Sequence, residues 1–321
     1  MESLPLQLSN AIDRQLASLP SNKLRDACFD LSQRYIQGQL IKTQLHRQAY
    51  MAARLPATYG ATRQVFRRIE SFLNPLKTLL DLGAGMGSLA WAAVDAMPNL
   101  HHITLFERDV EMLRMGQSLT LNNLDPVEIA WCRDDITQAL SFPSHEVVTL
   151  SYVLNELSPK ELAHVVHRAY EAADKILILI EPGTPKGYSN ILMARTLLIN
   201  QGGHIIAPCP HQEPCPLAPA FKEGKDWCHF RVRIPRGTYH RRAKDASLPY
   251  EDEKYSYLVV SKGDQAPTAD RIIKAPILKT GHVILDLCTQ NAQLERRIVS
   301  KSEGELYAQA RDYDWGDEWT G

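Results

Sequence analysis

The stretch KTLLDLGAGMGSLAWAAVDAM, residues 77–97, decides the fold. It begins as a short apolar run that ends in glycines, and it continues as a helix-like run rich in alanine. Glycine permits a tight turn and lets a ligand approach the backbone where a larger side chain would block it. The stretch therefore predicts a strand, a glycine turn and a helix, with a ligand bound at the turn.

Strand-like and helix-like runs continue to alternate beyond this stretch. The helix-like runs are DVEMLRMGQSLTLNN at 109–123 and SPKELAHVVHRAYEAA at 158–173. The strand-like runs around them are HHITLFE at 101–107, VEIAWCRDD at 127–135, EVVTLSYVLNEL at 146–157 and KILILIEPG at 175–183. Such alternation predicts a parallel sheet with right-handed crossovers, which is a doubly wound α/β domain.

Changes in composition divide the chain into four predicted segments. Residues 1–70 show helical periodicity in blocks separated by Pro20, Gly38 and PATYG at 56–60, which predicts a helical N-terminal extension. Residues 71–200 form the α/β core, and residues 201–302 form a cysteine-containing, basic and β-rich region. Residues 303–321 hold six acidic residues against one arginine, so we expect a solvated, disordered tail.

The glycine turn reads Asp81, then Gly83, Gly85 and Gly87 at a spacing of two. A dinucleotide fingerprint would require glycine where Ser88 stands. The pattern resembles motif I of the class I S-adenosylmethionine (SAM)-dependent methyltransferases, and this resemblance implies SAM as the cofactor.

The same resemblance assigns acidic residues at the ends of the next two strands. Glu107 closes the second strand, where a carboxylate can accept both ribose hydroxyls of a nucleoside. Asp134 or Asp135, after the third strand, would contact the adenine amino group.

The segment after the fourth strand limits the chemistry that the sequence supports. It lacks the [DNS]-P-P-[YF] motif that grips a planar amine, and it has no Pro-Cys nucleophile. Asn155 and Glu156 are its polar candidates for catalysis. Glu156 is either a general base or a carboxylate at a helix N-terminus.

Four of the six cysteines form a candidate metal site. Cys209, Cys215 and Cys228 follow a C-x5-C-x12-C spacing in a proline-rich segment, and Cys288 ends the strand-like HVILDLC. We interpret the other two, Cys28 and Cys132, as core residues. Four thiolates can hold zinc or an iron–sulfur cluster, and histidines at 204, 211 and 229 could substitute in a zinc site. The residues alone leave iron–sulfur, zinc and no metal as open alternatives.

Several segments together resemble one family. QAYMAARLPATYG, DLGAGMGS, SYVLNEL, IEPGTPKGY and the APCPHQEPCPL…DWCHF segment are similar to the methyltransferase-like family of mitochondrial small-ribosomal-subunit (rRNA) assembly factors and their bacterial homologues. The resemblance covers roughly residues 45–300. It implies a class I methyltransferase fold that carries a [4Fe-4S] cluster and associates with small-subunit rRNA. Carried over by position, the cluster ligands would be Cys209, Cys215, Cys228 and Cys288.

The net charge of −1 excludes a polycation, so nucleic-acid binding would depend on a local patch. Residues 222–244 hold eight basic residues against two acidic ones. Phosphate contacts from lysine and arginine supply most of the affinity for RNA. We predict an RNA-binding set within this segment: Arg231, Arg233, Arg236, Arg241, Arg242 and Lys244.

Three functions compete at this point. The chain is a SAM-dependent methyltransferase acting on the small ribosomal subunit or its rRNA, or a catalytically silent assembly factor that binds rRNA through the cluster and basic loop. The third candidate is a zinc-stabilised small-molecule methyltransferase. With no apolar run long enough to span a bilayer and no visible targeting peptide, we expect a cytoplasmic, bacterial, monomeric protein without membrane contact.

Overall fold

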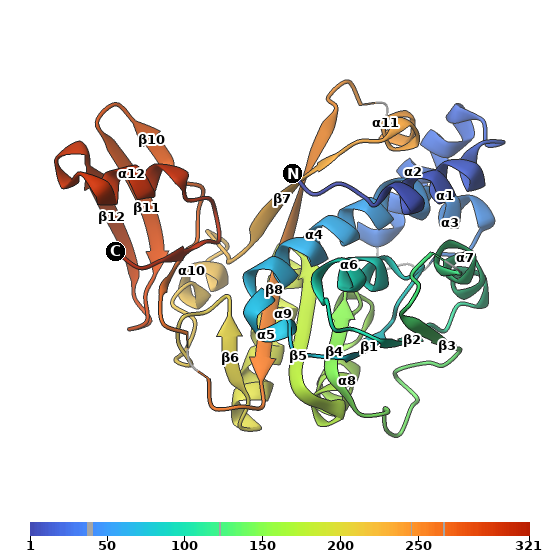
Figure 1. The fold of residues 1–321 in the computed structure, drawn as a ribbon, viewed down its shortest axis with the longest axis horizontal. Coiled ribbons are helices and arrows are strands. Elements are labelled where there is room, and N and C mark those ends of the chain that lie inside the picture. Colours follow the sequence, from blue (N-terminus) through green and yellow to red (C-terminus); the bar gives the residue numbers. More distant parts are fainter. Residues whose placement is uncertain (37–40, 122, 245, 266) are drawn as a thin grey trace. The chain divides into compact units, whose positions relative to one another are not determined.

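The structure, a computed structural model, describes residues 1–36, 41–121, 123–244, 246–265 and 267–321 (Figure 1). The chain forms two compact units, which are described separately. The first contains residues 1–174 and 232–253, and the second contains residues 175–231 and 254–321. The predicted four-part division by composition stays a prediction, because compact units are defined by packing.

The first unit begins with helices and continues as a sheet with helical crossovers. Its helices are α1 (Leu6–Leu16), α2 (Ser21–Ile36), α3 (Gln44–Ala49), the π-helix η1 (Tyr50–Arg54), α4 (Leu55–Arg68), α5 (Glu70–Leu73), α6 (Ser88–Ala96), α7 (Val110–Thr120), the 3-10 helix η2 (Leu154–Glu156), α8 (Pro159–Ala172) and α11 (Thr238–Lys244). Its strands are β1 (Thr78–Leu82), β2 (His102–Phe106), β3 (Glu128–Cys132) and β4 (His145–Ser151).

These four strands are parallel and lie in the order β3-β2-β1-β4. In this unit α4 and α6 cover one face of the sheet and α8 covers the other (Figure 1). The carboxyl ends of β1, β2 and β4 therefore meet at one edge, because parallel strands end on the same side. The predicted Rossmann-like, doubly wound fold is confirmed.

The second unit contains further strands, among them those of a separate small sheet. It holds α9 (Pro185–Asn200), β6 (His204–Ala207), α10 (Ala218–Lys222), β9 (Asp270–Ile272), β10 (Ile277–Lys279), β11 (His282–Cys288), β12 (Leu294–Ser300), the 3-10 helix η3 (Lys301–Glu303), α12 (Glu305–Asp312) and β13 (Glu318–Trp319). Strands β5 (Ala173–Pro182), β7 (Phe230–Pro235) and β8 (Tyr250–Ser261) have residues in both units. Strand β8 pairs antiparallel with β5 and with β6.

The acidic tail is folded, which corrects the expectation of disorder. Helix α12 and strand β13 both lie in it, and β13 pairs with β9. Ala310 and Trp319 are buried in one apolar cluster with Val283, Leu285 and Val299. The acidic residues occupy the outer positions of these elements, so composition alone concealed the apolar contacts.

Two breaks were also expected within the helical extension, at PATYG and at Gly38. PATYG was expected to separate two helices, but it lies inside α4, because proline is tolerated in the first turn of a helix. The expected break at Gly38 lies outside the described residues.

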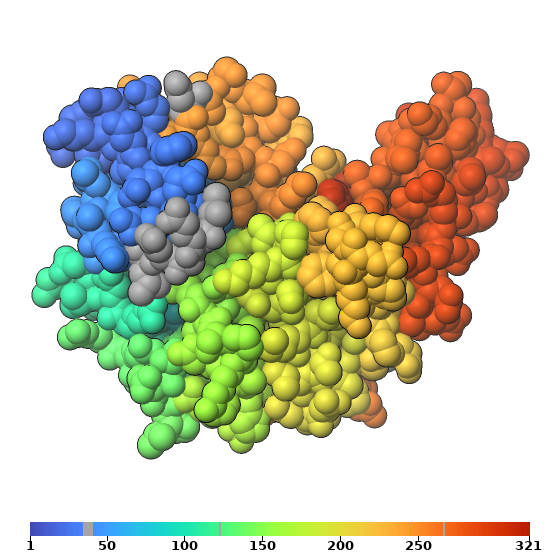
Figure 2. Space-filling model, turned by 180° about the vertical axis from the view of Figure 1, so that it is seen from behind, coloured from blue at the N-terminus to red at the C-terminus, as the bar shows by residue number. Residues whose placement is uncertain are grey.

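Helix α11, which the strand-like interpretation of the basic region missed, packs beside α2, and Figure 2 shows the orange and blue segments adjacent.

Candidate functional site

The glycine turn follows β1 as predicted. Gly83, Gly85 and Gly87 have φ values of 82°, 57° and 77°, a left-handed region that favours glycine. A Cβ at position 83 would stand 2.5 Å from Cγ2 of Val153, so the turn is tightly packed as well. The backbone N–H of Gly83 donates to the carbonyl of Phe106 at 2.9 Å, which joins the turn to the end of β2.

Glu107 lies directly at this turn, which brings two predicted site residues together. Its Oε2 accepts a hydrogen bond from Gly85 N at 2.9 Å, and its Oε1 accepts one from Asp109 N at 2.7 Å. Burial raises the pKa of Glu107, while these two backbone donors act to lower it. The carboxylate is thus oriented at the carboxyl edge of the sheet, and its contact with a ribose stays a prediction.

Asp81 is buried under the turn. It is 2% exposed, and Thr149 Oγ1 donates to its Oδ1 at 2.8 Å. Burial raises its pKa to about 7; the Thr149 hydrogen bond opposes this shift and the charge of Glu107 adds to it. A carboxyl group with so perturbed a pKa beside a candidate ligand site is itself a candidate functional group.

The raised pKa of Asp81 predicts a pH-dependent stability. Its folded-state pKa lies above the ordinary value of 3.8, so its stabilising contribution is complete below about pH 4 and is lost as pH rises through about 7. Asp81→Asn should therefore raise the free energy of unfolding by about 4 kcal/mol at pH 8 and have little effect at pH 4. Urea titrations at both pH values measure this difference. Asp13→Asn, at an exposed position, is the control, and equal pH slopes in Asp81→Asn and wild type would contradict the prediction.

Asp134 and Asp135 follow β3, and their carboxylates accept hydrogen bonds from residues of the turn that they form. Asp134 is exposed, and its Oδ1 accepts from Asp135 N at 2.8 Å. Asp135 accepts from Thr137 N and Oγ1 at 2.9 and 2.8 Å. Although burial alone would raise the pKa of Asp135, these bonds and the charge of Arg108 lower it. Contact of either residue with an adenine stays a prediction.

Asn155 and Glu156 lie in η2, which follows β4. Glu156 Oε2 pairs with Arg108 Nη2 at 3.0 Å, and Arg108 Nη1 also lies 3.8 Å from Asp135 Oδ2. Burial raises the pKa of Glu156, and the Arg108 charge lowers it. Arg108 therefore links the ends of β2, β3 and β4, and a catalytic role for Asn155 or Glu156 stays a prediction.

Tyr50 lies beside the glycine turn, and the sequence interpretation did not single it out. Its hydroxyl stands 3.2 Å from where a Cβ at Gly85 would be. Burial raises its pKa to about 12, so the phenol stays protonated. Three residues earlier, Arg47 Nη2 pairs with Asp109 Oδ2 at 2.7 Å and fastens this helical segment at the end of β2. The segment QAYMAARLPATYG, quoted only for its family resemblance, was the available signal.

Tyr152, at the end of β4, lies in the SYVLNEL segment, but the sequence interpretation did not single it out. Its φ of 61° is unusual for a residue other than glycine, and such strain gathers at functional sites. Its hydroxyl donates to Glu253 Oε1 at 3.2 Å. Arg54 pairs with the same carboxylate at 3.1 Å, and its guanidinium lies 5.6 Å from the Tyr152 ring centroid.

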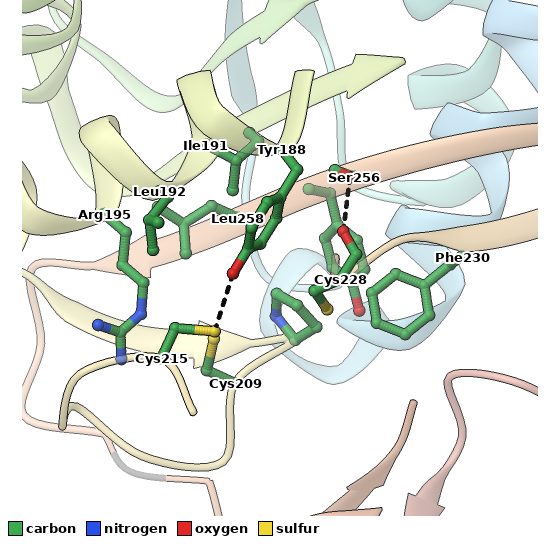
Figure 3. Close-up of a pocket in the computed structure, with 12 residues that line it drawn as sticks. Tyr188, Ile191, Leu192, Arg195, Cys209, Cys215, Cys228, Phe230, Ser256 and Leu258 are labelled. Carbon is green, nitrogen blue, oxygen red and sulfur yellow. Dashed lines mark hydrogen bonds between the residues drawn. The ribbon is translucent and has the colours of Figure 1, made fainter. Parts of the chain in front are cut away.

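The four predicted cysteine ligands gather in the second unit. Cys288, at the end of β11, belongs to an apolar cluster against which Cys215 and Cys228 pack. Cys209, Cys215 and Cys228 line one pocket, and Figure 3 shows the sulfur atoms of Cys209 and Cys215 side by side. All four are free thiols. His211, one of the candidate zinc ligands, places Nε2 3.4 Å from Cys288 Sγ.

No group of three or more histidine, cysteine, aspartate or glutamate side chains within the described ranges stands in an arrangement that could hold a metal ion. The four-cysteine centre therefore stays a prediction, although its residues converge from distant parts of the sequence. Burial raises the pKa of Cys209 and of Cys228, and neighbouring cysteines add to the rise. As neutral thiols they can pack together, whereas thiolates would require a compensating charge.

The basic segment is partly neutralised by acids of β8. Glu251 accepts from Arg236 at 3.2 Å, from His240 at 3.0 Å and from Lys244. Although burial alone would raise the pKa of Glu251, the hydrogen bonds from His240 and Lys244 hold it well below the ordinary value. Sequence counting missed these partners because they lie on another strand.

The other basic candidates differ in their surroundings. Arg233 pairs with Asp252 at 2.7 Å, and the Arg231 guanidinium lies 5.8 Å from the centroid of an indole ring. Arg241 and Arg242 are exposed on α11. RNA binding by this set stays a prediction, and these two arginines are its best-placed members for phosphate contact.

Comparison with known proteins identifies similar chains. Residues 44–320 match the family model described as "Mitochondrial small ribosomal subunit Rsm22". The human "Ribosome assembly protein METTL17, mitochondrial" is 27% identical over 293 residues, which cover 84% of this chain and 61% of that protein. The Schizosaccharomyces pombe "Rsm22-cox11 tandem protein 2, mitochondrial" is 27% identical over 327 residues, covering 84% of this chain. This chain spans 42% of the length of that relative.

The relatives contradict the prediction of a cytoplasmic protein. The two S. pombe tandem proteins, human METTL17 and the Saccharomyces cerevisiae "Ribosome assembly protein RSM22, mitochondrial" are all described as mitochondrial. The prediction depended on an N-terminal sequence without a recognisable targeting pattern, which is weak support for a location. As to membranes, no helix in the described part of the chain is long and apolar enough to cross one.

Solved methyltransferase structures show a distant likeness. Magnesium protoporphyrin IX methyltransferase from Synechocystis PCC 6803 with bound SAH is 14% identical, with a TM-score of 0.44, covering 75% of this chain and 97% of that one. The mitomycin 7-O-methyltransferase MmcR is 17% identical, with a TM-score of 0.40, covering 78% of this chain and 73% of that one.

Proposed function

Because this chain belongs to the Rsm22 family of mitochondrial small-ribosomal-subunit proteins, we propose that it is a SAM-binding, methyltransferase-like factor in the assembly of the small ribosomal subunit. The observation that carries the proposal is the match over residues 44–320, which includes both the glycine turn and the four cysteines. Two similar proteins are named ribosome assembly proteins, which supports the same role.

The cofactor site of this proposal is the edge formed by β1, β2 and β4. Gly83 and Gly85 leave room for the cofactor at the backbone, and Glu107 would accept its ribose hydroxyls. Tyr50 and Tyr152 would border the same edge from η1 and from the end of β4. SAM, when bound, supplies an electrophilic methyl group.

The proposal includes a [4Fe-4S] cluster held by Cys209, Cys215, Cys228 and Cys288. Two observations support the fit: the four thiols converge, and the guanidinium of Arg195 reaches Cys209 with a buried positive charge. Cysteine thiolates are the usual ligands of such clusters, and zinc is the alternative occupant. Arg241 and Arg242 are proposed to contact rRNA phosphates.

The second candidate function is assembly without methyl transfer. The ion pair between Glu156 and Arg108 supports it, because one carboxylate oxygen of Glu156 is already held by Arg108 Nη2 at 3.0 Å and is not free to accept a proton from a substrate. In this case the cofactor pocket would serve binding alone. The zinc-stabilised small-molecule methyltransferase has weaker support, because it leaves the ribosomal relatives unexplained.

The test uses small-subunit precursors from cells that lack this protein. We expect the purified protein to co-sediment with them and to transfer labelled methyl groups from SAM to a precursor component. Co-sedimentation and SAM binding without transfer would support the silent assembly factor. Absence of co-sedimentation at low salt would contradict both.

The cluster has its own test. Anaerobically purified protein should be brown, with broad absorbance at about 400 nm, and Cys228→Ser should lose the iron and the colour. Cys132→Ser is the matched control, since Cys132 lies in β3 among the parallel strands and should keep both. Colourless wild-type protein with stoichiometric zinc would contradict the cluster.

A further inference from the structure

The pocket that holds the cysteines has one helix as its wall. Helix α9 presents Tyr188, Ile191, Leu192 and Arg195 to it, at the i, i+3, i+4 and i+7 positions of a single helical face (Figure 3). The two middle residues are apolar, and the two outer residues carry polar hydrogen-bond donors. The wall therefore offers donors at two separate points around the thiols.

Both donors face the cysteines. The Tyr188 hydroxyl lies 3.2 Å from Cys215 Sγ, and the Arg195 side chain lines the pocket together with Cys209. Figure 3 shows both side chains pointing from α9 toward these two cysteines. Tyr188 is 3% exposed and Arg195 is 5% exposed, so bulk water does not compete for the polar groups of either side chain.

Arg195 carries a buried charge without an acidic partner. Its Nη2 donates to the carbonyl oxygens of His211 at 3.1 Å and Glu213 at 2.6 Å, and its Nε has no partner. No carboxylate among the described residues lies within ion-pair distance of it. An uncompensated buried cation is strongly destabilising, so a negative charge beside Arg195 would stabilise the fold.

A second buried arginine, Arg271, also hydrogen-bonds the loop that carries Cys209. Arg271, in β9, is 2% exposed, and its Nε donates to the carbonyl of Pro208 at 2.9 Å. Its charge is already paired with Glu318 at 3.0 Å. The loop of Cys209 and Cys215 is thus held by two arginines, of which only Arg195 lacks a counter-ion.

We propose that Arg195 and Tyr188 are positioning residues that stabilise the anionic form of a thiolate-ligated centre and raise its reduction potential. The inference rests on the proposed cluster. A cluster bound by four thiolates is net negative, and reduction adds one more negative charge. A nearby cation and hydrogen bonds to sulfur stabilise the reduced state more than the oxidised state. Loss of either group should therefore shift the potential to a more negative value.

The experiment measures iron content and reduction potential in the full-length protein purified without oxygen. Arg195→Gln should shift the potential negative and lose iron faster under chelator, Arg195→Lys should show a smaller shift, and Tyr188→Phe should shift in the same direction. Arg311→Gln removes the same charge from an exposed site of the same unit and should match wild type.

The outcomes separate this inference from the proposed function. Wild-type protein without iron would overturn the cluster itself and with it this inference. Iron-loaded wild type with unchanged potential in Arg195→Gln and Tyr188→Phe would overturn the inference alone. If Arg195→Gln fails to fold, the potentials of Tyr188→Phe and Arg195→Lys test the inference, because both substitutions nearly keep the size of the side chain on α9.

Discussion

Replacing Glu107 by glutamine is expected to weaken SAM binding by about 10- to 150-fold, because a hydrogen bond to a charged acceptor contributes about 1.5–3 kcal/mol. The carboxylate is already oriented by Gly85 N and Asp109 N at 2.9 and 2.7 Å. Glutamine keeps the size of the side chain but replaces one acceptor oxygen with an NH₂ group, which would face a backbone donor.

Isothermal titration with SAM and with S-adenosylhomocysteine measures this effect. Glu111→Gln is the matched control, because Glu111 lies on α7 with a 42% exposed side chain paired to Arg114. Thermal unfolding of each variant separates a loss of binding from a loss of structure. If wild-type binding is measurable and the dissociation constant of Glu107→Gln lies within threefold of it, Glu107 does not contact the bound cofactor.

Alanine at Gly187 is expected to lower the free energy of unfolding by more than about 4 kcal/mol, or to prevent folding of the second unit. A Cβ there would stand 2.0 Å from the carbonyl oxygen of Pro182 and 3.3 Å from Cβ of Glu181. The obstacle is backbone at the end of β5, which cannot rotate away. Gly187 N also donates to the Thr184 side chain at 3.1 Å, so the first turn of α9 has little freedom to shift.

Urea unfolding of the two alanine variants tests this directly. Gly237→Ala is the control, since a Cβ there meets nothing within 4 Å and the residue has no positive φ. It should change stability by less than about 0.5 kcal/mol. Because α9 forms a wall of the cysteine pocket, Gly187→Ala should also lose any bound iron. Wild-type stability in Gly187→Ala would contradict the close packing of α9 on β5.

Much of the fold could be predicted because its signals are local. Alternating runs around residues 77–183 contain the strand and helix periodicities, and glycines at 83, 85 and 87 occupy positions where φ is positive. The placement of Glu107 at the glycine turn was also predictable, since adjacent parallel strands end at one edge. The family assignment depended on resemblance, which periodicity does not supply.

Other features of the fold could not be predicted from local sequence. PATYG was interpreted as a break, yet proline in the first turn of α4 leaves the helix intact. The acidic tail was expected to be disordered, yet Trp319 is buried with residues of β11 and β12. In both cases a contact distant in sequence, or a position within the element, outweighed local composition.

By itself the sequence determined the parallel α/β core, the glycine turn and the identity of four candidate thiol ligands. Only the tertiary structure decided which charges remain uncompensated. Arg236 and Lys244 counted as free cations in the sequence, but both pair with Glu251, whereas Arg195 is buried beside Cys209 without an acid. The physical reason is that electrostatic energy depends on distance and burial in space, and a linear sequence specifies neither for residues on different elements.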